Sequence, residues 1–292
     1  MNLRTLLTLG RTSNLPTVWS NMLSGAVLSG AVFGPAELAV LLVCGSAFYE
    51  GGMFLNDAFD ADIDARERPT RPIPAGQVTR ATVLALGFGL LGLGILLLGV
   101  APSLRLTRPG FAATLAGVGT CAAVLVYNRW HKGHAWSPIV MGACRAGLYA
   151  TAALAVSGEL GPVVLIGAGA LWLYIVGLTH IARFETGTVM DRAWVAAFVL
   201  SPLVAAAPAV VTQRRLLPAL CFALLLGWSL RCMSFALRGG KGQIPRAVVS
   251  LIAGVSLVDA LFISLHGTPF GVLAALGAFL LTLKWQRKIP GT

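Results

Sequence analysis

The sequence has few charged residues and few cysteines for a chain of 292 residues. Charged side chains make up 11% of the chain, and only 11 residues are acidic, against 22 Lys and Arg. A typical soluble domain carries about 25% charged residues, so a soluble globular protein is excluded. The five cysteines all lie in apolar segments and form no CxxC pair, which excludes a disulfide framework and a Cys/His zinc site.

Apolar residues are abundant instead, at 57% of the chain. They gather in successive runs of about 20 residues, the length of helix that crosses a bilayer. We expect spans near residues 17–34, 37–57, 81–101, 110–128, 136–157, 161–181, 193–211, 216–236, 245–265 and 270–285. The sequence therefore predicts an all-α integral membrane protein, a polytopic bundle of nine or ten transmembrane helices that forms a single domain over residues 1–292.

The basic residues are distributed unevenly between the two sides of this predicted bundle. One side receives only Arg105, Arg108, Arg214 and Arg215; Arg145 falls inside a span, and all the other Lys and Arg residues fall on the opposite side. By the positive-inside rule the richer side is cytoplasmic. The net charge of +11 follows from this asymmetry and from attraction to anionic lipid headgroups, so the charge gives no reason to expect a nucleic-acid partner.

An acidic cluster follows the second predicted span. Within Asn56–Asp64 four carboxylates and an amide stand close together in a chain that is poor in acids. Asn56, Asp60 and Asp64 are spaced at i, i+4 and i+8, so on a helix they share one slowly drifting face. Such clustered oxygens repel one another unless a cation lies among them, and they suit Mg²⁺ that bridges to a phosphate. The alternative interpretation is a solvated loop with incidental acids.

Three polar segments connect alternate spans on the same side of the predicted bundle. They cover residues 56–79, 127–132 and 180–192. Acids from the first segment and basic groups from the other two would form a pocket for a magnesium diphosphate, and the apolar spans beneath would hold a lipid tail. His131 and His134 flank Lys132 and are interpreted as interfacial residues, because no third soft ligand is nearby.

The first of these segments resembles the UbiA superfamily of intramembrane prenyltransferases. The resemblance is carried by Asn56-Asp57-x-x-Asp60-x-x-x-Asp64, followed by Arg68-Pro69-x-Arg71-Pro72-Ile73-Pro74 and Gly76. These residues match the first aspartate-rich motif of that family and the basic, proline-containing stretch after it. The resemblance implies an all-helical bundle of nine spans with a central cavity open to lipid, in which case the tenth predicted segment would be an addition.

The resemblance also implies roles for individual residues. Asn56, Asp60 and Asp64 would hold the Mg²⁺ that bridges to an isoprenyl diphosphate, and Asp57 and Asp62 would act less directly. The resemblance adds diphosphate or lid contacts from Arg68 and Arg71, a catalytic pair formed by Tyr127 and Lys132, and a substrate contact from Asn14. On physical grounds, Tyr127 and Tyr174 are the candidates for an aromatic ring that faces the allylic cation. Metal and cations at one end would stabilise the charge that develops when the carbon–oxygen bond breaks.

The sequence departs from the family pattern in the third polar segment. The family normally places two Asp residues, four positions apart, at the end of the sixth span, where they bind a second Mg²⁺. Here only Glu185 is acidic, and His180 and Arg183 stand where metal ligands are expected. One hypothesis is that Arg183 replaces the second Mg²⁺ and contacts the diphosphate directly, with His180 and Glu185 as further substrate contacts. The competing hypothesis is that catalysis is weakened or lost.

The altered second motif looks like the EboC-like branch of the superfamily when it is taken together with Arg145 and Asp259 inside predicted spans and the run Gly240-Lys241-Gly242. That branch is associated with gene clusters for the export or maturation of secondary metabolites. An unpaired charge within a span costs about 2.5–3.5 kcal/mol on insertion scales. We therefore expect either that the two residues pair with each other or that Arg145 contacts the substrate diphosphate. For Asp259 a hydrogen bond between helices is the structural alternative.

The sequence as a whole predicts a Mg²⁺-dependent prenyltransferase. It would move an isoprenyl group from a prenyl diphosphate to an unknown acceptor, for which an aromatic molecule is one candidate. It would lie in a bacterial inner membrane with its active-site loops in the cytoplasm. The alternative is a non-catalytic protein that binds or transports a prenyl phosphate or a metabolite precursor in the same pocket. Loss of the second acidic motif favours this alternative over two-metal chemistry.

Overall fold

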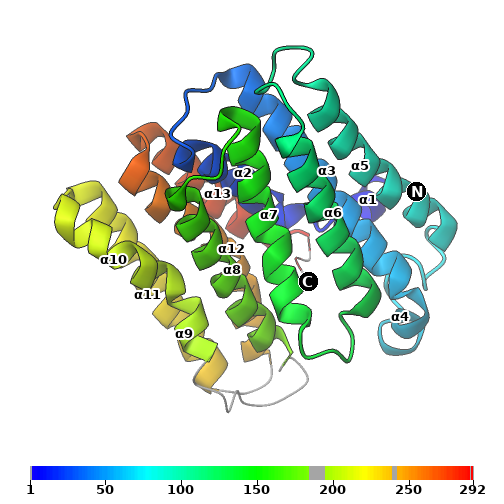
Figure 1. Ribbon diagram of the computed structural model, residues 1–292. Helices are drawn as coiled ribbons and strands as arrows, with labels where there is room; N and C mark the ends of the chain where they lie inside the picture. The colour runs from blue at the N-terminus through cyan, green and yellow to red at the C-terminus, as the bar shows by residue number, and fades with distance from the viewer. Residues whose placement is uncertain (1, 184–194, 239–241, 290, 292) are drawn as a thin grey trace.

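The computed structural model describes residues 2–183, 195–238, 242–289 and 291, and every regular element in these residues is a helix (Figure 1). The helices are α1 (Leu3–Leu9), η1 (Thr12–Asn14), α2 (Leu15–Leu28), α3 (Pro35–Phe59), α4 (Ala61–Glu67), α5 (Arg80–Val100), α6 (Ala112–Trp130), α7 (Ser137–Ser157), α8 (Pro162–Ala182), α9 (Val195–Val199), α10 (Ser201–Gln213), α11 (Leu216–Arg238), α12 (Gln243–His266) and α13 (Pro269–Gln286). Glu185 and Asp191 of the third polar segment lie outside the described residues.

Seven helices in the described part of the chain are long and apolar enough to cross a membrane: α3, α5, α7, α8, α11, α12 and α13. This confirms the prediction of an all-α integral membrane protein. Large apolar side chains such as Leu96, Val204, Leu220 and Leu280 remain exposed on the outer helices. Such a surface would be unfavourable in water but suits contact with lipid tails.

Three predicted spans are not among these seven helices. The span predicted at 110–128 is α6, whereas the other two differ from the observed helices. The span predicted at 17–34 is α2, which ends at Leu28 because Gly30 turns the chain with a left-handed φ of 72°. The span predicted at 193–211 is divided between α9 and α10. Pro202 opens α10, and because proline has no backbone N–H it cannot continue the hydrogen bonding of the preceding turn.

The helices pack around a centre formed by α2 and α12. α2 contacts α3, α7, α12 and α13, while α12 contacts α2, α8, α11 and α13. Figure 1 shows α5 and α6 on one side of this centre, and α10 and α11 on the other. One core cluster joins α8 to α13 with parts of α2 and α7, and a second joins α2, α3, α5, α6 and α7.

Glycine allows α3 and α5 to approach each other closely. A Cβ atom added to Gly94 would lie 2.4 Å from Cε1 of Phe48, and one added to Gly87 would lie 2.7 Å from Cγ of Leu55. Any larger residue would push the two helices apart, because both partners are buried side chains of α3. This packing fixes the direction in which α3 delivers its last turn, which carries Asn56.

Candidate functional site

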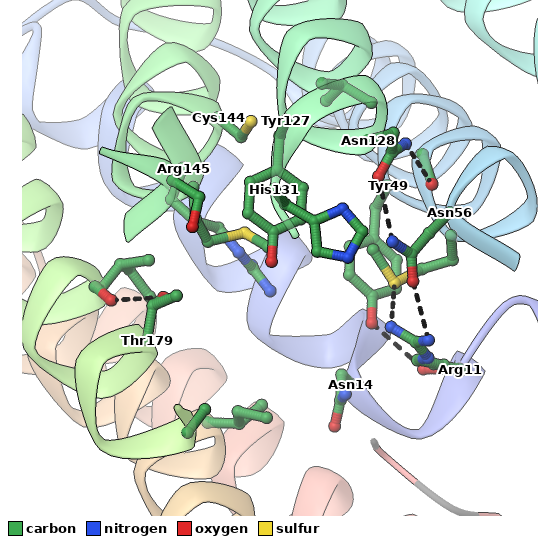
Figure 2. A pocket seen from close by; sticks show the side chains of 18 of the residues that line it. Arg11, Asn14, Tyr49, Asn56, Tyr127, Asn128, His131, Cys144, Arg145 and Thr179 are labelled. Carbon is green, nitrogen blue, oxygen red and sulfur yellow. Dashed lines mark hydrogen bonds between the residues drawn. The ribbon is translucent and has the colours of Figure 1, made fainter. Parts of the chain in front are cut away.

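A cavity of about 410 Å³ lies among η1, α3, α4, α6, α7, α8 and α12 (Figure 2). Most of its polar lining comes from the ends of these helices and the segments between them: Arg11, Asn56, Asp60, Asp64, Arg68, Arg71, Asn128, His131, Lys132 and Arg183. Further along the same helices the lining is mostly apolar: Phe48, Val124, Leu148, Ile175, Ile252 and Val255. The cavity therefore joins a charged end to an apolar chamber.

The predicted acidic face forms at the junction between α3 and α4. The junction is not one uninterrupted helix, because α3 ends at Phe59 and Asp60 caps both helices. Helical hydrogen bonding nevertheless continues across it: the N–H of Asp60 donates to the carbonyl of Asn56 at 3.0 Å, and the N–H of Asp64 donates to that of Asp60 at 2.8 Å. As the i, i+4, i+8 spacing predicts, Asn56, Asp60 and Asp64 all line the cavity.

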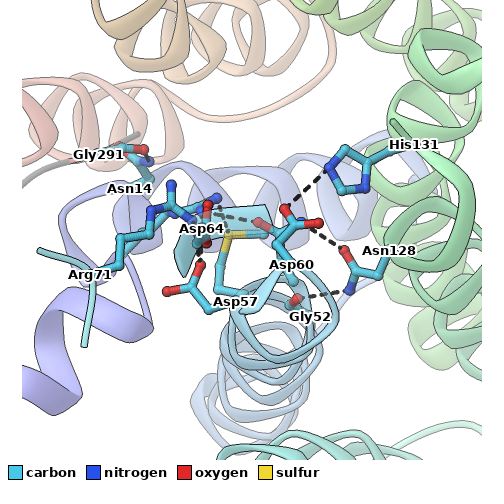
Figure 3. A network of polar contacts seen from close by, with 12 residues as sticks. Asn14, Gly52, Asp57, Asp60, Asp64, Arg71, Asn128, His131 and Gly291 are labelled. Carbon is cyan, nitrogen blue, oxygen red and sulfur yellow. Dashed lines mark hydrogen bonds and ion pairs between the residues drawn. The ribbon is translucent and has the colours of Figure 1, made fainter. Parts of the chain in front are cut away.

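Two arginines neutralise the acids on one side of this junction (Figure 3). Arg71 places Nη1 3.0 Å from both Asp57 Oδ1 and Asp64 Oδ2. Arg11 places Nη2 3.1 Å from Asp57 Oδ1 and donates to Asn56 Oδ1 at 3.0 Å. These carboxylates are almost fully buried, so their repulsion is balanced by protein cations rather than by solvent.

Arg11 reaches the acids from an unusual backbone conformation. Its φ of 43° lies in the left-handed region, where residues other than glycine are uncommon. Tyr49 accompanies it, because the Tyr49 hydroxyl donates to the Arg11 carbonyl at 3.4 Å. The short turn between α1 and η1 therefore aims a guanidinium at the end of α3. The sequence assigned Arg11 no role in the site, although Arg11 lies three residues before the predicted substrate contact Asn14.

The remaining acid of the face, Asp60, contacts the segment after α6. Its Oδ2 lies 3.4 Å from both His131 Nε2 and Lys132 Nζ. Burial by itself would raise the pKa of Asp60, but the hydrogen bonds and charges of His131 and Lys132 outweigh burial and hold its pKa below the ordinary value. His131 is thus part of the charged end of the cavity, not only an interfacial residue as the sequence suggested.

An amide pair joins the last turns of α3 and α6. Asn56 Nδ2 donates to Asn128 Oδ1 at 3.3 Å, and Asn128 Nδ2 donates to the carbonyl of Gly52 at 2.9 Å. Both asparagines are buried. Asn128 therefore positions Asn56 toward the cavity. Sequence analysis missed this role, although Asn128 directly follows Tyr127 in the second polar segment.

Tyr127 lines the cavity from α6, and its ring stacks on His131 with centroids 4.9 Å apart. Tyr174, the other aromatic candidate, does not belong to the lining. It is fully buried, and its hydroxyl donates to the carbonyl of Leu251 at 2.9 Å. The substrate contact expected of Tyr174 therefore lacks support from its position, because its side chain lies in the interface between α8 and α12. Tyr49 is the second tyrosine on the cavity wall.

The end of α8 contributes Arg183, which lines the cavity but is tied to the neighbouring connection. Its guanidinium donates to the carbonyls of His134 and Ala135 and, at 2.9 Å, to Ser137 Oγ. Arg183 thus holds the α6–α7 connection against α8. His180, by contrast, is not among the described residues that line the cavity. The substrate contact expected of His180 therefore lacks support from its position.

Two further predicted contacts do belong to the lining. Arg68 lies exposed on the segment after α4 and faces the cavity end. Asn14 is buried and lines the cavity, but its amide is engaged: Nδ2 donates to the carbonyl of Gly291 at 2.8 Å, and Gln286 Nε2 donates to Asn14 Oδ1 at 2.9 Å. Asn14 therefore joins the N-terminal and C-terminal parts of the chain at the edge of the cavity (Figure 3).

The two charged residues inside spans are connected through an amide. Arg145 Nη1 donates to Asn21 Oδ1 at 2.8 Å, and Asn21 Nδ2 donates to Asp259 Oδ2 at 2.9 Å. Arg145 and Asp259 therefore do not form the direct ion pair that was one expectation. Asp259 of α12 instead forms the alternative that was expected for it, a hydrogen bond between helices, with Asn21 of α2.

The oxygen-rich end of the cavity suits a magnesium ion only together with further oxygen ligands. Among the described residues no group of three or more His, Cys, Asp and Glu side chains is arranged to hold a metal alone. Asp60 and Asp64 nevertheless line one cavity with the amide of Asn56. Mg²⁺ commonly takes one or two carboxylates and completes its shell with water and substrate phosphates. This donor set fits that mode of binding.

The fold and the site define a polytopic helical membrane protein with an acidic, oxygen-rich end above an apolar chamber. The UbiA prenyltransferase family matches residues 15–238, which is more than half of the chain, and the protein belongs to this family. The match agrees with the resemblance seen in Asn56–Gly76. It does not distinguish the EboC-like branch, which stays a prediction.

Individual relatives are similar over shorter stretches. A digeranylgeranylglyceryl phosphate synthase of Metallosphaera sedula is 28% identical over 161 residues, which cover 55% of this chain and 44% of that protein. The chain therefore spans less than half the length of this relative. Among solved structures, a UbiA homolog from Aeropyrum pernix K1 superposes with a TM-score of 0.66 at 18% identity, covering 85% of this chain and 96% of that one.

A UbiA homolog from Archaeoglobus fulgidus bound to DMAPP and Mg²⁺ covers 98% of this chain and 100% of its own, with a TM-score of 0.52 at 13% identity. At such low identities these structures establish a shared fold and no more.

Proposed function

We propose that the protein is a Mg²⁺-dependent prenyltransferase that moves an isoprenyl group from a prenyl diphosphate to an acceptor within the membrane. The observation that carries this proposal is the cavity that joins Asn56, Asp60 and Asp64 to an apolar chamber within a membrane-spanning bundle. Two comparisons support it: the Metallosphaera relative is a digeranylgeranylglyceryl phosphate synthase, and the Archaeoglobus homolog is bound to DMAPP and Mg²⁺.

The proposed reaction breaks the carbon–oxygen bond between the allylic carbon and the diphosphate. The electron pair leaves with the diphosphate, a nucleophilic atom of the acceptor bonds to the allylic carbon, and that atom releases a proton. Mg²⁺ held by Asp60, Asp64 and Asn56 would neutralise the charge that builds on the leaving group. Arg68, Arg71 and Lys132 line the same end and would bind the diphosphate oxygens.

The apolar part of the cavity would hold the isoprenyl tail and exclude water from the allylic cation. Phe48, Val124 and Leu148 offer it no polar group. Tyr127 lines the cavity three residues after Val124 on α6 and stacks on His131 of the charged end, so its ring is suited to face the developing positive charge. The donor would therefore lie with its charged end at α4 and its tail among α3, α6 and α7.

The proposal also includes the architecture and the location of the protein. We propose a single domain with nine or ten spans, located in a bacterial inner membrane, with its active-site loops in the cytoplasm. The basic residues support this orientation, because Arg105, Arg108, Arg214 and Arg215 belong to connections other than those that carry the acidic junction.

The second candidate function is binding or transport of a prenyl phosphate without catalysis. It is favoured by the charge balance at the motif, where Arg11, Arg71, His131 and Lys132 already pair with the acids. A closed network of this kind can receive a phosphate headgroup through its basic members without a metal.

Release of pyrophosphate decides between the two functions. The purified protein in lipid is incubated with Mg²⁺, with geranyl, farnesyl or geranylgeranyl diphosphate, and with a panel of aromatic acceptors. An active transferase releases pyrophosphate, and Asp60→Asn abolishes the release whereas Asp62→Asn, a change at an exposed acid of α4, preserves it. Tight binding of the diphosphates without release, across the acceptor panel, would favour the binding or transport function.

A further inference from the structure

A second cationic site lies on the cavity wall, apart from the acidic motif. Arg145 belongs to the face of α7 that lines the cavity together with Ser137, Met141, Cys144 and Leu148. Its guanidinium lies 5.4 Å from the centroid of the Tyr49 ring (Figure 2). Within the described part of the chain no carboxylate approaches Arg145 within ion-pair distance. A cation in an apolar wall without a contacting anion is costly, and in membrane proteins it commonly marks a functional position.

A neutral amide, Asn21, contacts this cation directly and is itself held by a buried carboxylate. Asn21 accepts from Arg145 at 2.8 Å and donates to the two oxygens of Asp259 at 3.1 and 2.9 Å. Asp259 also accepts a hydrogen bond from Tyr149, and Asn21, Asp259 and Tyr149 are all fully buried. Asp259 therefore fixes Asn21, and Asn21 orients Arg145, while the negative charge stays one side chain away from the cavity.

A guanidinium has five N–H donors arranged as a fork that matches a carboxylate. One nitrogen of Arg145 is used by Asn21, so the arrangement keeps the guanidinium oriented but leaves its charge available to a ligand in the cavity.

Tyr49 connects this cationic site to the acidic motif through direct contacts. Its ring contacts Arg145, and its hydroxyl donates to the carbonyl of Arg11, whose guanidinium contacts Asn56 and Asp57. An anion bound to Arg145 would therefore lie about one tyrosine side chain from the motif. That separation suits two substrates that meet in one cavity.

We propose that Arg145 binds a carboxylate-type anionic group of the acceptor, and that Asn21 is the positioning residue that presents it. This inference rests on the proposed function. The donor cannot supply the anion at this position, because its diphosphate would occupy the end lined by Arg68, Arg71 and Lys132 and its tail carries no charge. The acceptor is thus a molecule with an anionic group at one end and its nucleophilic atom directed toward Asp60.

Benzoate and benzamide test the inference without knowledge of the natural acceptor, because they share a shape and differ in charge. Binding of each to the purified protein is measured by titration calorimetry, alongside Mg²⁺-dependent binding of farnesyl diphosphate. Benzoate should bind the wild type and benzamide should not. Arg145→Gln should weaken benzoate binding about tenfold, the loss of one charge-assisted contact, while farnesyl diphosphate binding changes less than about twofold. Arg145→Lys should retain part of the preference for benzoate.

Arg183→Gln is the matched control, because Arg183 also lines the cavity but bonds to the α6–α7 connection. It should leave the benzoate preference intact. Asn21→Ala keeps the cation and removes its support, so it should reduce the ratio of benzoate to benzamide binding. A purely structural role for Asn21 would lower thermal stability and leave this ratio unchanged, which would overturn its assignment as a positioning residue.

Other results overturn the assignment of Arg145. Equal binding of benzoate and benzamide to the wild type would do so, as would benzoate binding that Arg145→Gln does not weaken. An equal loss of benzoate and farnesyl diphosphate binding in Arg145→Gln would place Arg145 at the diphosphate instead. If Arg145→Gln fails to fold, Arg145→Lys and the wild-type comparison still decide. Failure of the wild type to bind farnesyl diphosphate would reject the proposed function, whereas failure of benzoate alone rejects only this inference.

Discussion

Replacing Arg71 by glutamine should destabilise the folded protein far more than the same change at Arg80. Both arginines belong to the region after α4, and both lie 3.0–3.1 Å from a carboxylate oxygen. They differ in burial. The side chains of Arg71 and Asp64 are 17% and 4% exposed, whereas those of Arg80 and Asp62 are 44% and 77% exposed. The two variants therefore compare one interaction in two environments.

The magnitude follows from what each change leaves behind. Removing one partner of a buried ion pair costs about 3–5 kcal/mol, because the other charge stays buried and unpaired. Arg71→Gln leaves Asp64 in that condition, but Asp57 keeps its contact with Arg11, so the lower end of the range, about 3 kcal/mol, is expected. Arg80→Gln breaks an exposed pair and should cost about 0–1 kcal/mol.

Reversible unfolding in mixed micelles, titrated with SDS in the absence of substrates and Mg²⁺, gives the free energy of unfolding of both variants and of the wild type. Equal losses for the two variants would refute the reasoning, since the acids at the end of α3 would then not depend on Arg71. Arg71→Lys supplies a second comparison. It keeps the charge but not the geometry that lets one guanidinium serve two carboxylates, so an intermediate loss is expected.

Three further predictions concern other parts of the molecule. Arg183→Ala should weaken diphosphate binding by about 1.5–3 kcal/mol if its guanidinium contacts the ligand, and unchanged calorimetric affinity would remove it from the binding site. Gly94→Ala should lower the free energy of unfolding by about 1–3 kcal/mol, because its Cβ would overlap Phe48, whereas Gly92→Ala on the open face of α5 should be neutral; equal effects would contradict this packing. A cysteine at Thr70 should react with an impermeant maleimide only from the cytoplasmic side, and labelling from outside would invert the topology.

The sequence predicted the fold class well because lipid allows few alternatives. A backbone that crosses a bilayer must satisfy its own hydrogen bonds, so apolar runs of this length become helices. The boundaries depended on local signals that hydropathy does not contain. α2 ends at Leu28 although the apolar run continues, because Gly30 reverses the chain, and α9 and α10 separate at Pro202 within one apolar run.

The candidate site was predictable where it depended on spacing along one helix and not where it depended on packing between helices. Asn56, Asp60 and Asp64 line the cavity because helical periodicity survives the junction at Asp60. The sequence could not show that Tyr174 lies on the face of α8 that packs against α12, where its hydroxyl donates to the carbonyl of Leu251. Arg11 could not be found from spacing, since it reaches the motif across 45 residues of sequence.

The acids of the motif are paired with basic side chains, and these pairs affect how a metal and a diphosphate would bind. Asp60 lies against His131 and Lys132, and Asp64 lies against Arg71, so each of these two carboxylates is paired with a basic side chain of the protein. Mg²⁺ alone would have to separate these pairs and leave Arg71 and Lys132 without partners, which is unfavourable in a buried site. If a diphosphate bound together with Mg²⁺, its oxygens would accept hydrogen bonds from these basic side chains while the acids would be released to hold the metal. Under the proposed function, the residues that pair with one another in this motif would therefore couple the binding of metal and donor.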